Sequence, residues 1–233
     1  MSLRVSGDGQ YLSRSANLPS ITSFTILGKS YIVSDRGTGQ SQQLVDVAGN
    51  GVDYAARLAY GDFSNTMTVI ANGSSGNLAS RPATSRWFLW YLQCSGSWSN
   101  QIEGGWGYCD DSSSVVKANC TLNAGDTSTV AIYIGTISVL NSWWADARYQ
   151  DIIVSNDVWT AAEINAQRYR RRLVHGANTN VWAHGRSAAT ASAAATDYSG
   201  NGRNFTVNGS PTIEADIPNY VQEFSLAGMG AGA

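Results

Sequence analysis

The sequence predicts an all-β fold, a sandwich of two antiparallel sheets with one short helix at about residues 160–174. Short apolar runs rich in β-branched and aromatic residues recur along the chain, near the intervals of about 8–12 residues that are typical of sandwiches. Glycine, asparagine, aspartate and serine separate these runs, and the chain contains 24 glycines. Only one segment combines a helix-start pattern with a helix-stop pattern, so a single helix is expected.

The composition fits one large β domain. The chain has 233 residues, and we expect one domain over residues 1–227 followed by a Gly/Ala-rich C-terminal tail at 228–233. Hydrophobic residues make up 43% and charged residues 14%, which is enough apolar material for a sizeable core. The formal net charge of -2 argues against nucleic acid as a partner. We expect no membrane insertion and no signal peptide, because the sequence shows neither pattern.

The first half of the chain predicts strands separated by turns. The stretch from Leu3 to Leu12 predicts two short strands around a Gly-Asp-Gly turn. The run from Arg86 to Leu92 is the most apolar, which predicts a central strand buried on both faces. Further strands are expected near residues 24–26, 44–47, 54–60 and 67–70, with a glycine turn at 49–51.

The second half of the chain also predicts strands separated by polar stretches. Residues 95–108 form a polar stretch rich in Gly and Ser, which predicts loops, and strands are expected near 115–117 and 129–135. Tyr149 to Val154 predicts a strand buried on at least one face, which the polar residues 155–157 end. The residues expected to be largely buried are Phe24, Ile26, Trp87, Leu89, Ile132, Ile134, Ile152 and Val154.

The helix is expected to begin at Thr160. Thr160 and Glu163 have the spacing of a capping box, in which each side chain binds the other residue's amide. Four arginines, at 168 and 170–172, lie near the carboxyl end, which favours cations, and we expect them to be solvated. Docking of nucleic acid or of a carboxylate-rich partner by these arginines is the alternative. The expected buried face consists of Ala162, Ala166, Tyr169 and Leu173.

The run from Ala147 to Ile164 resembles a motif of the laminin-G-like, or concanavalin-A-like, jelly-roll domains. In that motif a small residue, a strand ending near Asn, an apolar residue and Thr/Ser-x-x-Glu-Ile follow in this order. Phe24-Thr25-Ile26 and the Asp-x-Ser-Gly-Asn-Gly turn at 197–202 resemble further parts of the family pattern. The resemblance implies a concanavalin-A-like jelly-roll sandwich. The residues that match its structural motifs are Asp151, Asn156, Thr160, Glu163, Asp197, Gly200 and Gly202.

The resemblance also raises the question of enzymatic activity. The family includes β-glucanases, which typically carry Glu-x-Asp-x-x-Glu along one strand so that their two carboxylates face the substrate. Glu214-Ala215-Asp216 matches the first half, but Asn219 stands where the second glutamate would be. We therefore expect no enzyme, and a β-glucanase-type glycoside hydrolase is the least favoured of three functions.

Aromatic and amide side chains between residues 98 and 110 predict a carbohydrate site. Trp98, Trp106 and Tyr108 can offer ring faces to the apolar side of a sugar, and Asn100 and Asp110 can bind its hydroxyls. Packing of these rings in the core is the alternative.

Two further sets of residues could carry chemistry. Asp110, Asp111 and Asp126 could hold calcium through their carboxylate oxygens, although they lack an EF-hand spacing, and no other cofactor is indicated. Of the three cysteines, Cys109 and Cys120 could form a hairpin bridge, but reduced thiols are the favoured state.

The function expected first is that of a non-enzymatic structural protein on the surface of a phage or virus particle. Order in the tail 228–233 would need neighbouring subunits, because its small side chains bury little surface and ordering each residue costs about 1–2 kcal/mol. The partners would be other subunits of the assembly, as a head-decoration or tail component, with cell-surface glycans as optional ligands. A free carbohydrate-binding adhesion module is the alternative. The expected location is the virion surface or the extracellular space.

Overall fold

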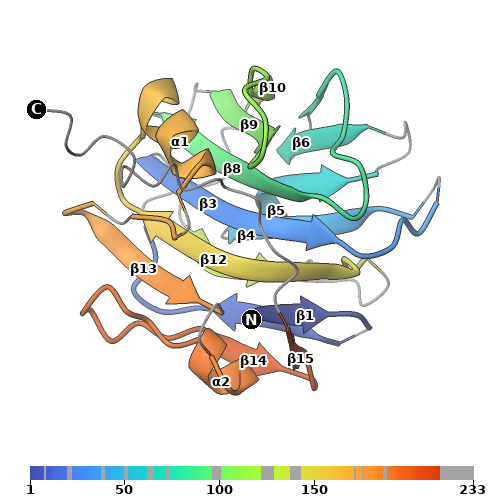
Figure 1. Cartoon of the computed structure of the whole chain (residues 1–233). Helices are drawn as coiled ribbons and strands as arrows, with labels where there is room; N and C mark the ends of the chain where they lie inside the picture. The colour runs from blue at the N-terminus through green and yellow to red at the C-terminus, as the bar shows by residue number, and fades with distance from the viewer. Residues whose placement is uncertain are drawn as a thin grey trace, which may run out of the picture.

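Two antiparallel sheets pack face to face in the computed structural model, with an apolar core between them (Figure 1). The predicted all-β sandwich of two antiparallel sheets is confirmed. The predicted site residues Trp98, Asn100 and Asp126 and the tail 228–233 lie outside the described residues. The structure describes residues 1–7, 9–19, 23–37, 40–49, 52–61, 66–71, 74–95, 101–121, 129–136, 143–170, 172–174, 176–185 and 188–215.

Sheet A has eight strands and contains the predicted central strand. Every residue from Trp87 to Leu92 is buried, which confirms a strand covered on both faces. The β1 and β13 strands follow one another along the same side of β12. In pairing order the strands are β10 (Val116–Thr121), β9 (Gln101–Tyr108), β8 (Trp87–Ser95), β3 (Ser23–Ile32), β12 (Ala147–Ser155), β1 (Ser2–Val5) and β15 (Thr212–Glu214), with β13 (Thr179–His184) also on β12.

Sheet B has seven strands, and its centre is the predicted pair of strands on either side of the glycine turn at 49–51. These two strands, β4 and β5, are antiparallel neighbours. The strands in pairing order are β14 (Thr206–Asn208), β2 (Tyr11–Arg14), β11 (Thr129–Ile134), β4 (Gln42–Gly49), β5 (Val52–Tyr60), β6 (Met67–Ala71) and β7 (Ser74–Asn77).

The eight side chains expected to be buried are all buried, each at most 4% exposed. Six of them lie in the core between the sheets, whereas Trp87 and Leu89 belong to a second apolar cluster on the outer face of sheet A. At one position within sheet A, where β3 pairs with β8, the packing requires a glycine. A Cβ on Gly28 would lie 2.1 Å from ring atom Cζ2 of Trp90, whose Nε1 donates to Ser30 Oγ at 2.7 Å. The close approach of Trp90 to β3 therefore depends on Gly28.

The helix α1 (Ala161–Arg168) covers the outer cluster of sheet A (Figure 1). It begins as predicted, since Glu163 N donates to Thr160 Oγ1 at 3.2 Å and Thr160 N donates to Glu163 Oε2 at 2.7 Å. It ends at Arg168 rather than near residue 174. The buried ammonium of Lys29 donates to the carbonyl oxygens of Arg168 and Arg170, which satisfies acceptors at the helix end and stops further turns.

The predicted buried face of the helix is wrong. Ala162 and Ala166 are exposed and Tyr169 is 38% exposed, whereas Ile164 is buried. The reason is side-chain size: burying the large Ile164 stabilises the contact with the sheet more than burying an alanine methyl. Leu173 is buried as expected, but it lies beyond the helix.

Two strand predictions need correction. The strands β1 and β2 both form, but they do not pair with each other, because β1 belongs to sheet A and β2 to sheet B. The turn after Gly7, where Gln10 N donates to Gly7 O at 3.2 Å, therefore connects the two sheets. The stretch predicted to be loops also contains β9, a full partner of β8.

The residues that matched the family's structural motifs hold turns and strand ends in place. Asp151 Oδ2 accepts from Leu173 N at 3.0 Å, and Asn156 Oδ1 accepts from Asn180 Nδ2 at 3.1 Å. Gly200 and Gly202 adopt φ angles of +91° and +66°, which glycine tolerates without strain. These glycines shape a loop that follows α2 (Ala191–Ala194), a short helix in addition to the single one expected from the sequence.

Asp197 is the centre of this loop. Its Oδ1 accepts from the amides of Trp182 and Ser199, both at 2.9 Å, and its Oδ2 accepts from Arg203 N at 2.8 Å. Burial by itself raises the pKa of Asp197, but these hydrogen bonds outweigh it and lower the pKa below its ordinary value. The ionised carboxylate thus attaches the loop to β13.

The three cysteines are buried and unbridged, so no Cys109–Cys120 disulfide forms.

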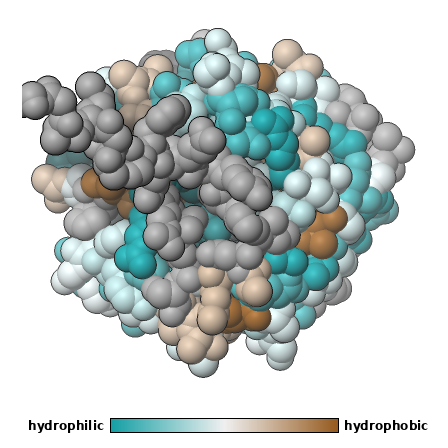
Figure 2. Space-filling view, viewed as in Figure 1, coloured by the Kyte–Doolittle hydropathy of each residue, from teal (hydrophilic) through white to brown (hydrophobic). Residues whose placement is uncertain are grey.

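On the face that carries α1 and α2, hydrophobic residues form small separate areas, one of them over α2 (Figure 2). In the part of the chain that the structure describes, neither helix is long and apolar enough to cross a membrane.

Candidate functional site

The aromatic residues predicted for carbohydrate binding have different environments. Trp106 points from β9 into the core, is 5% exposed, and its Nε1 donates to Ser80 O at 3.0 Å. Its ring meets those of Phe88 and Tyr108 edge-on, at centroid distances of 6.4 and 5.0 Å. Trp106 therefore packs in the core, which was the alternative, and it presents no open ring face to a sugar.

Tyr108 lies at the end of β9 and is half-buried. Its hydroxyl accepts from Ala83 N at 2.8 Å, and the guanidinium carbon of Arg86 lies 3.6 Å from the centre of its ring. Arg86 thus occupies the ring face that a sugar would need.

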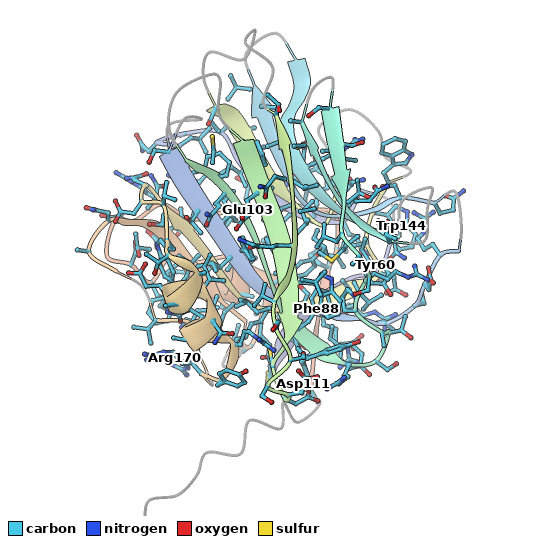
Figure 3. All side chains as sticks on the ribbon, turned by 90° about the horizontal axis from the view of Figure 1, so that it is seen from above. Tyr60, Phe88, Glu103, Asp111, Trp144 and Arg170 are labelled. Carbon is cyan, nitrogen blue, oxygen red and sulfur yellow. The ribbon has the colours of Figure 1, made fainter. Side chains whose placement is uncertain are left out.

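Asp110 and Asp111 are bound by the same arginine. Arg86 Nε donates to Asp110 Oδ2 at 3.0 Å, and its Nη2 donates to Asp111 Oδ2 at 2.9 Å. The hydrogen bond to Asp110, against the effect of burial, raises the pKa of Arg86 above its ordinary value. Burial raises the pKa of Asp111, but bonds from Ser113 and Arg86 outweigh it, so this pKa is lowered. Figure 3 shows Asp111 beyond the sheet ends, on the same side of the molecule as Arg170.

This arrangement does not fit calcium. Calcium takes about 6–8 oxygen ligands, and the carboxylates of Asp110 and Asp111 are already paired with two arginines, Arg86 and Arg168. Within the described ranges, no group of three or more Asp, Glu, His or Cys side chains could hold a metal ion. The third predicted ligand, Asp126, lies outside those ranges.

The arginines at the end of α1 differ from the expectation in one respect. Arg170 and Arg172 are exposed as predicted, but Arg168 is 1% exposed. Its guanidinium donates to the carbonyl oxygens of Tyr108, Asp111 and Ser113 at 2.7–3.0 Å. Arg168 therefore fixes the loop after β9. Two of the predicted carbohydrate-binding residues, Tyr108 and Asp110, lie at this loop, and both already contact Arg86.

A second group of residues lies on the outer face of sheet B. Its geometry is better suited to binding a sugar than that of the loop after β9. The register aligns Thr206, Ser13 and Tyr133 side by side on β14, β2 and β11, and it aligns Asn208 with Tyr11. Their neighbours Leu12 and Val207 point into the core, so these five side chains point outward. We call Tyr11, Ser13, Tyr133, Thr206 and Asn208 the tyrosine face.

The tyrosine face combines aromatic and hydrogen-bonding groups. The rings of Tyr11 and Tyr133 lie 5.9 Å apart at 51°, and both tyrosines are half-buried. Asn208 Nδ2 donates to Ser13 Oγ at 2.9 Å, which leaves Asn208 Oδ1 as an acceptor and the Ser13 hydroxyl as a donor. Burial, and then the proximity of Tyr11 and Asp46, raise the pKa of Tyr133, so its hydroxyl remains a donor.

The row continues from the tyrosine face toward the centre of the sheet. Asp46 lies opposite Tyr133 on β4, and Arg57 lies opposite Asp46 on β5. Asp46 is fully buried, Arg57 is 5% exposed, and the Trp143 ring centre lies 5.0 Å from the Arg57 guanidinium. The charged part of the row is therefore covered, whereas the tyrosine face at its end is more open.

Sequence reasoning missed the tyrosine face. Tyr11 and Tyr133 are 122 positions apart, and each appears in the sequence only as part of a strand pattern. The available signal was alternation, since Tyr11 and Ser13 flank Leu12, and Tyr133 lies between Ile132 and Ile134. Alternation marks these residues as outward-facing but does not show that their strands pair.

No protein-family model matches the sequence, and no curated protein matches it. Solved structures do resemble the chain. A candidate carbohydrate-binding protein of Bacteroides ovatus superimposes over 95% of this chain and 62% of its own length, with a TM-score of 0.65 and 14% identity. A heptameric pentraxin of Limulus polyphemus matches over 70% of this chain and 79% of its own length, with a TM-score of 0.53 and 11% identity.

Tailspike protein 2 of an Escherichia coli O157:H7 bacteriophage is also similar, with a TM-score of 0.52 and 9% identity. The match covers 79% of this chain but 28% of the tailspike. At these identities the likenesses show the fold, which is the concanavalin-A-like jelly-roll sandwich, and they do not show the function.

Proposed function

We propose that this protein is a non-enzymatic, lectin-like module that binds carbohydrate through the tyrosine face. The single observation that supports this most is the pair of neighbouring rings, Tyr11 and Tyr133, beside the hydrogen-bonding pair Ser13 and Asn208. Aromatic rings pack against the apolar side of a pyranose, and amide and hydroxyl groups bind its hydroxyls. The fold shared with the candidate carbohydrate-binding protein of Bacteroides ovatus is consistent with this role.

A glycan array tests this proposal. The intact protein should bind a restricted set of glycans, and Tyr133→Ala should weaken that binding at least about fivefold, because truncating an aromatic anchor commonly costs more than about 1 kcal/mol. Tyr133→Phe should retain most of the binding, since the ring remains.

The matched control is Tyr198→Ala. Tyr198 is 42% exposed and lies away from sheet B, with its ring 4.0 Å from that of His184. Binding that survives Tyr133→Ala, or that Tyr198→Ala removes equally, contradicts carbohydrate recognition at the tyrosine face.

The proposal includes the absence of glycoside hydrolysis. Each of the three glutamates within the described residues has a structural partner: Glu103 binds Tyr91 and Lys117, and Glu163 caps α1. Glu214 forms ion pairs with Arg4 and Arg148. Incubation with β-1,3 and β-1,4 glucans should release no reducing sugar. Turnover that disappears when one acidic residue is replaced would overturn this part of the proposal.

A second candidate is a role on the surface of a phage or virus particle, where the module would contact other subunits. The observation that favours it is the fold shared with the bacteriophage tailspike. Mass spectrometry of particles purified from the source culture should then detect this chain at a fixed ratio to the major particle proteins. Recovery of the chain only outside the particles supports a free adhesion module instead.

A further inference from the structure

A pocket of about 360 Å³ lies on the outer face of sheet A, between α1 and β10. Its walls are residues 112–115 of the loop before β10 and the first turns of α1, and Tyr91 contributes from β8. The pocket is separate from the tyrosine face, which belongs to sheet B. Its volume is at the lower end of the about 300–1,000 Å³ that is usual for small-molecule sites.

The base of the pocket is a hydrogen-bonded chain across three strands. The Tyr91 hydroxyl donates to Glu103 Oε1 at 2.8 Å, and Lys117 Nζ donates to Glu103 Oε2 at 3.0 Å. Glu103 lies on the side of sheet A that faces α1 (Figure 3). Gly105 makes this arrangement possible, because a Cβ there would lie 2.5 Å from Tyr91 Cε1 and 2.7 Å from the carbonyl oxygen of Val116.

The walls of the pocket are held by the buried Arg168. Its Nη1 donates to Ser113 O at 2.7 Å and to Asn165 Oδ1 at 2.9 Å, so it ties the loop to the helix. Ser113 N also donates to Asp111 Oδ1 at 3.0 Å. The pocket is therefore preorganised, which reduces the entropy that a ligand must lose to bind.

Apart from the Lys117 ammonium, the groups left for a ligand are neutral donors and acceptors. Because its Oδ1 accepts from Arg168, Asn165 offers its Nδ2 as a donor. The hydroxyls of Ser112 and Ser114 have no hydrogen-bond partner among the described residues, and Lys117 retains further N–H groups. Ile164 adds an apolar surface.

The charge balance selects the class of ligand. Lys117 is the charged residue of the lining, and Glu103 neutralises it, so an anion would compete with that carboxylate for the ammonium. A cation would meet the ammonium directly. Hydroxyls, an amide donor and an apolar wall in a small volume suit a neutral polyol. We propose that this pocket binds one neutral pyranose residue and is a second sugar site, independent of the tyrosine face.

Nuclear magnetic resonance titration of the labelled, full-length protein tests this site. The probes are the methyl glycosides of glucose, galactose, mannose and N-acetylglucosamine, with N-acetylneuraminic acid as the charged comparison. At least one neutral glycoside should produce saturable shifts in the amides of residues 112–117 and 161–165. Ala161→Trp, which fills the pocket from an exposed helix position, should weaken this binding at least about tenfold.

Ala162→Trp is the matched control, because Ala162 is also exposed on the first turn of α1 but does not line the pocket. It should leave the affinity unchanged within about twofold. The second site is overturned if no neutral glycoside shifts these amides, if Ala161→Trp leaves the binding intact, or if only N-acetylneuraminic acid binds there. Shifts at Tyr11 and Tyr133 report the tyrosine face separately, so either site can fail alone.

Discussion

The buried guanidinium of Arg168 donates from Nη2 to the carbonyl oxygen of Asp111 at 3.0 Å. This bond joins the end of α1 to the loop after β9. The carbonyl oxygens of Tyr108, at the end of β9, and of Ser113, in the loop, accept from the same side chain. An arginine used in this way stabilises backbone geometry rather than attracting a ligand, and its loss leaves several acceptors without a donor.

Replacing Arg168 should therefore destabilise the protein. We expect Arg168→Met to lower the free energy of unfolding by about 1–3 kcal/mol, since it leaves partly buried carbonyl oxygens unpaired. Arg170→Met should have little effect, because Arg170 is exposed at the same end of the helix. Urea unfolding followed by circular dichroism measures both. Equal stability of the two variants would show that the buried bonds contribute nothing.

Asp197 should make stability depend on pH in the acid range. Its folded pKa lies below its ordinary value of 3.8, so its contribution is complete above pH 3.8 and is lost as the pH falls through the folded value. Asp197→Asn should cost about 1–3 kcal/mol at neutral pH, because an amide cannot accept from Trp182, Ser199 and Arg203 together. It should also flatten the acid dependence of the melting temperature.

The control for this prediction is Asp157→Asn. Asp157 is exposed and accepts from the Asn178 side chain, so its replacement should change the neutral-pH stability little. An unchanged acid profile in Asp197→Asn would refute the assignment of that dependence to Asp197.

The cysteines should be unreactive in the folded protein. Burial raises the pKa of the Cys94 and Cys109 thiols to about 11, and burial also raises the pKa of Cys120. Iodoacetamide at neutral pH should modify none of the three until the protein is unfolded, after which all three should react. Mass spectrometry counts the additions. Rapid modification of a folded cysteine would contradict its buried position.

Gly105→Ala should damage both the sheet and the second sugar site. The added Cβ would collide with the Tyr91 ring and the Val116 carbonyl, and overpacking of this kind costs about 1–3 kcal/mol. Gly176→Ala is the control, because a Cβ at Gly176 has no neighbour within 4 Å and its φ angle is not positive. Thermal unfolding compares the two. An unchanged melting temperature of Gly105→Ala would contradict this account, because it would mean that the Tyr91 ring does not need the space above Gly105.

Sequence reasoning located the sandwich because strand patterns and capping are local. The Thr160–Glu163 box and the alternation around Ile132 and Ile134 involve neighbours in sequence, and both are observed. The sheet to which each strand belongs is not a local property. From the sequence, β1 and β2 appeared to form a hairpin with each other. In the structure β1 pairs with β12, which is 140 or more positions further along the chain, and β2 pairs with β11, which is more than 100 positions further along.

Trp106 was wrongly predicted to offer a ring face to a sugar for a related reason. The glycines between 104 and 107 suggested a loop, yet Gly105 and Gly107 lie within β9 beneath side chains from elsewhere. A Cβ on Gly107 would lie 2.7 Å from Arg168 Nε. Once β9 is a strand, its alternation directs Trp106 inward with Ile102. The tyrosine face, by contrast, depends on strand pairing that no local pattern contains.

Carbohydrate binding at the tyrosine face is most directly observed in a crystal structure of the intact protein with the glycan that binds best on the array. We expect a pyranose ring packed on Tyr11 and Tyr133, with its hydroxyls bonded to Ser13 and Asn208. Sugar density only on the loop after β9, or no sugar on the outer face of sheet B at saturating glycan, would contradict the proposed function.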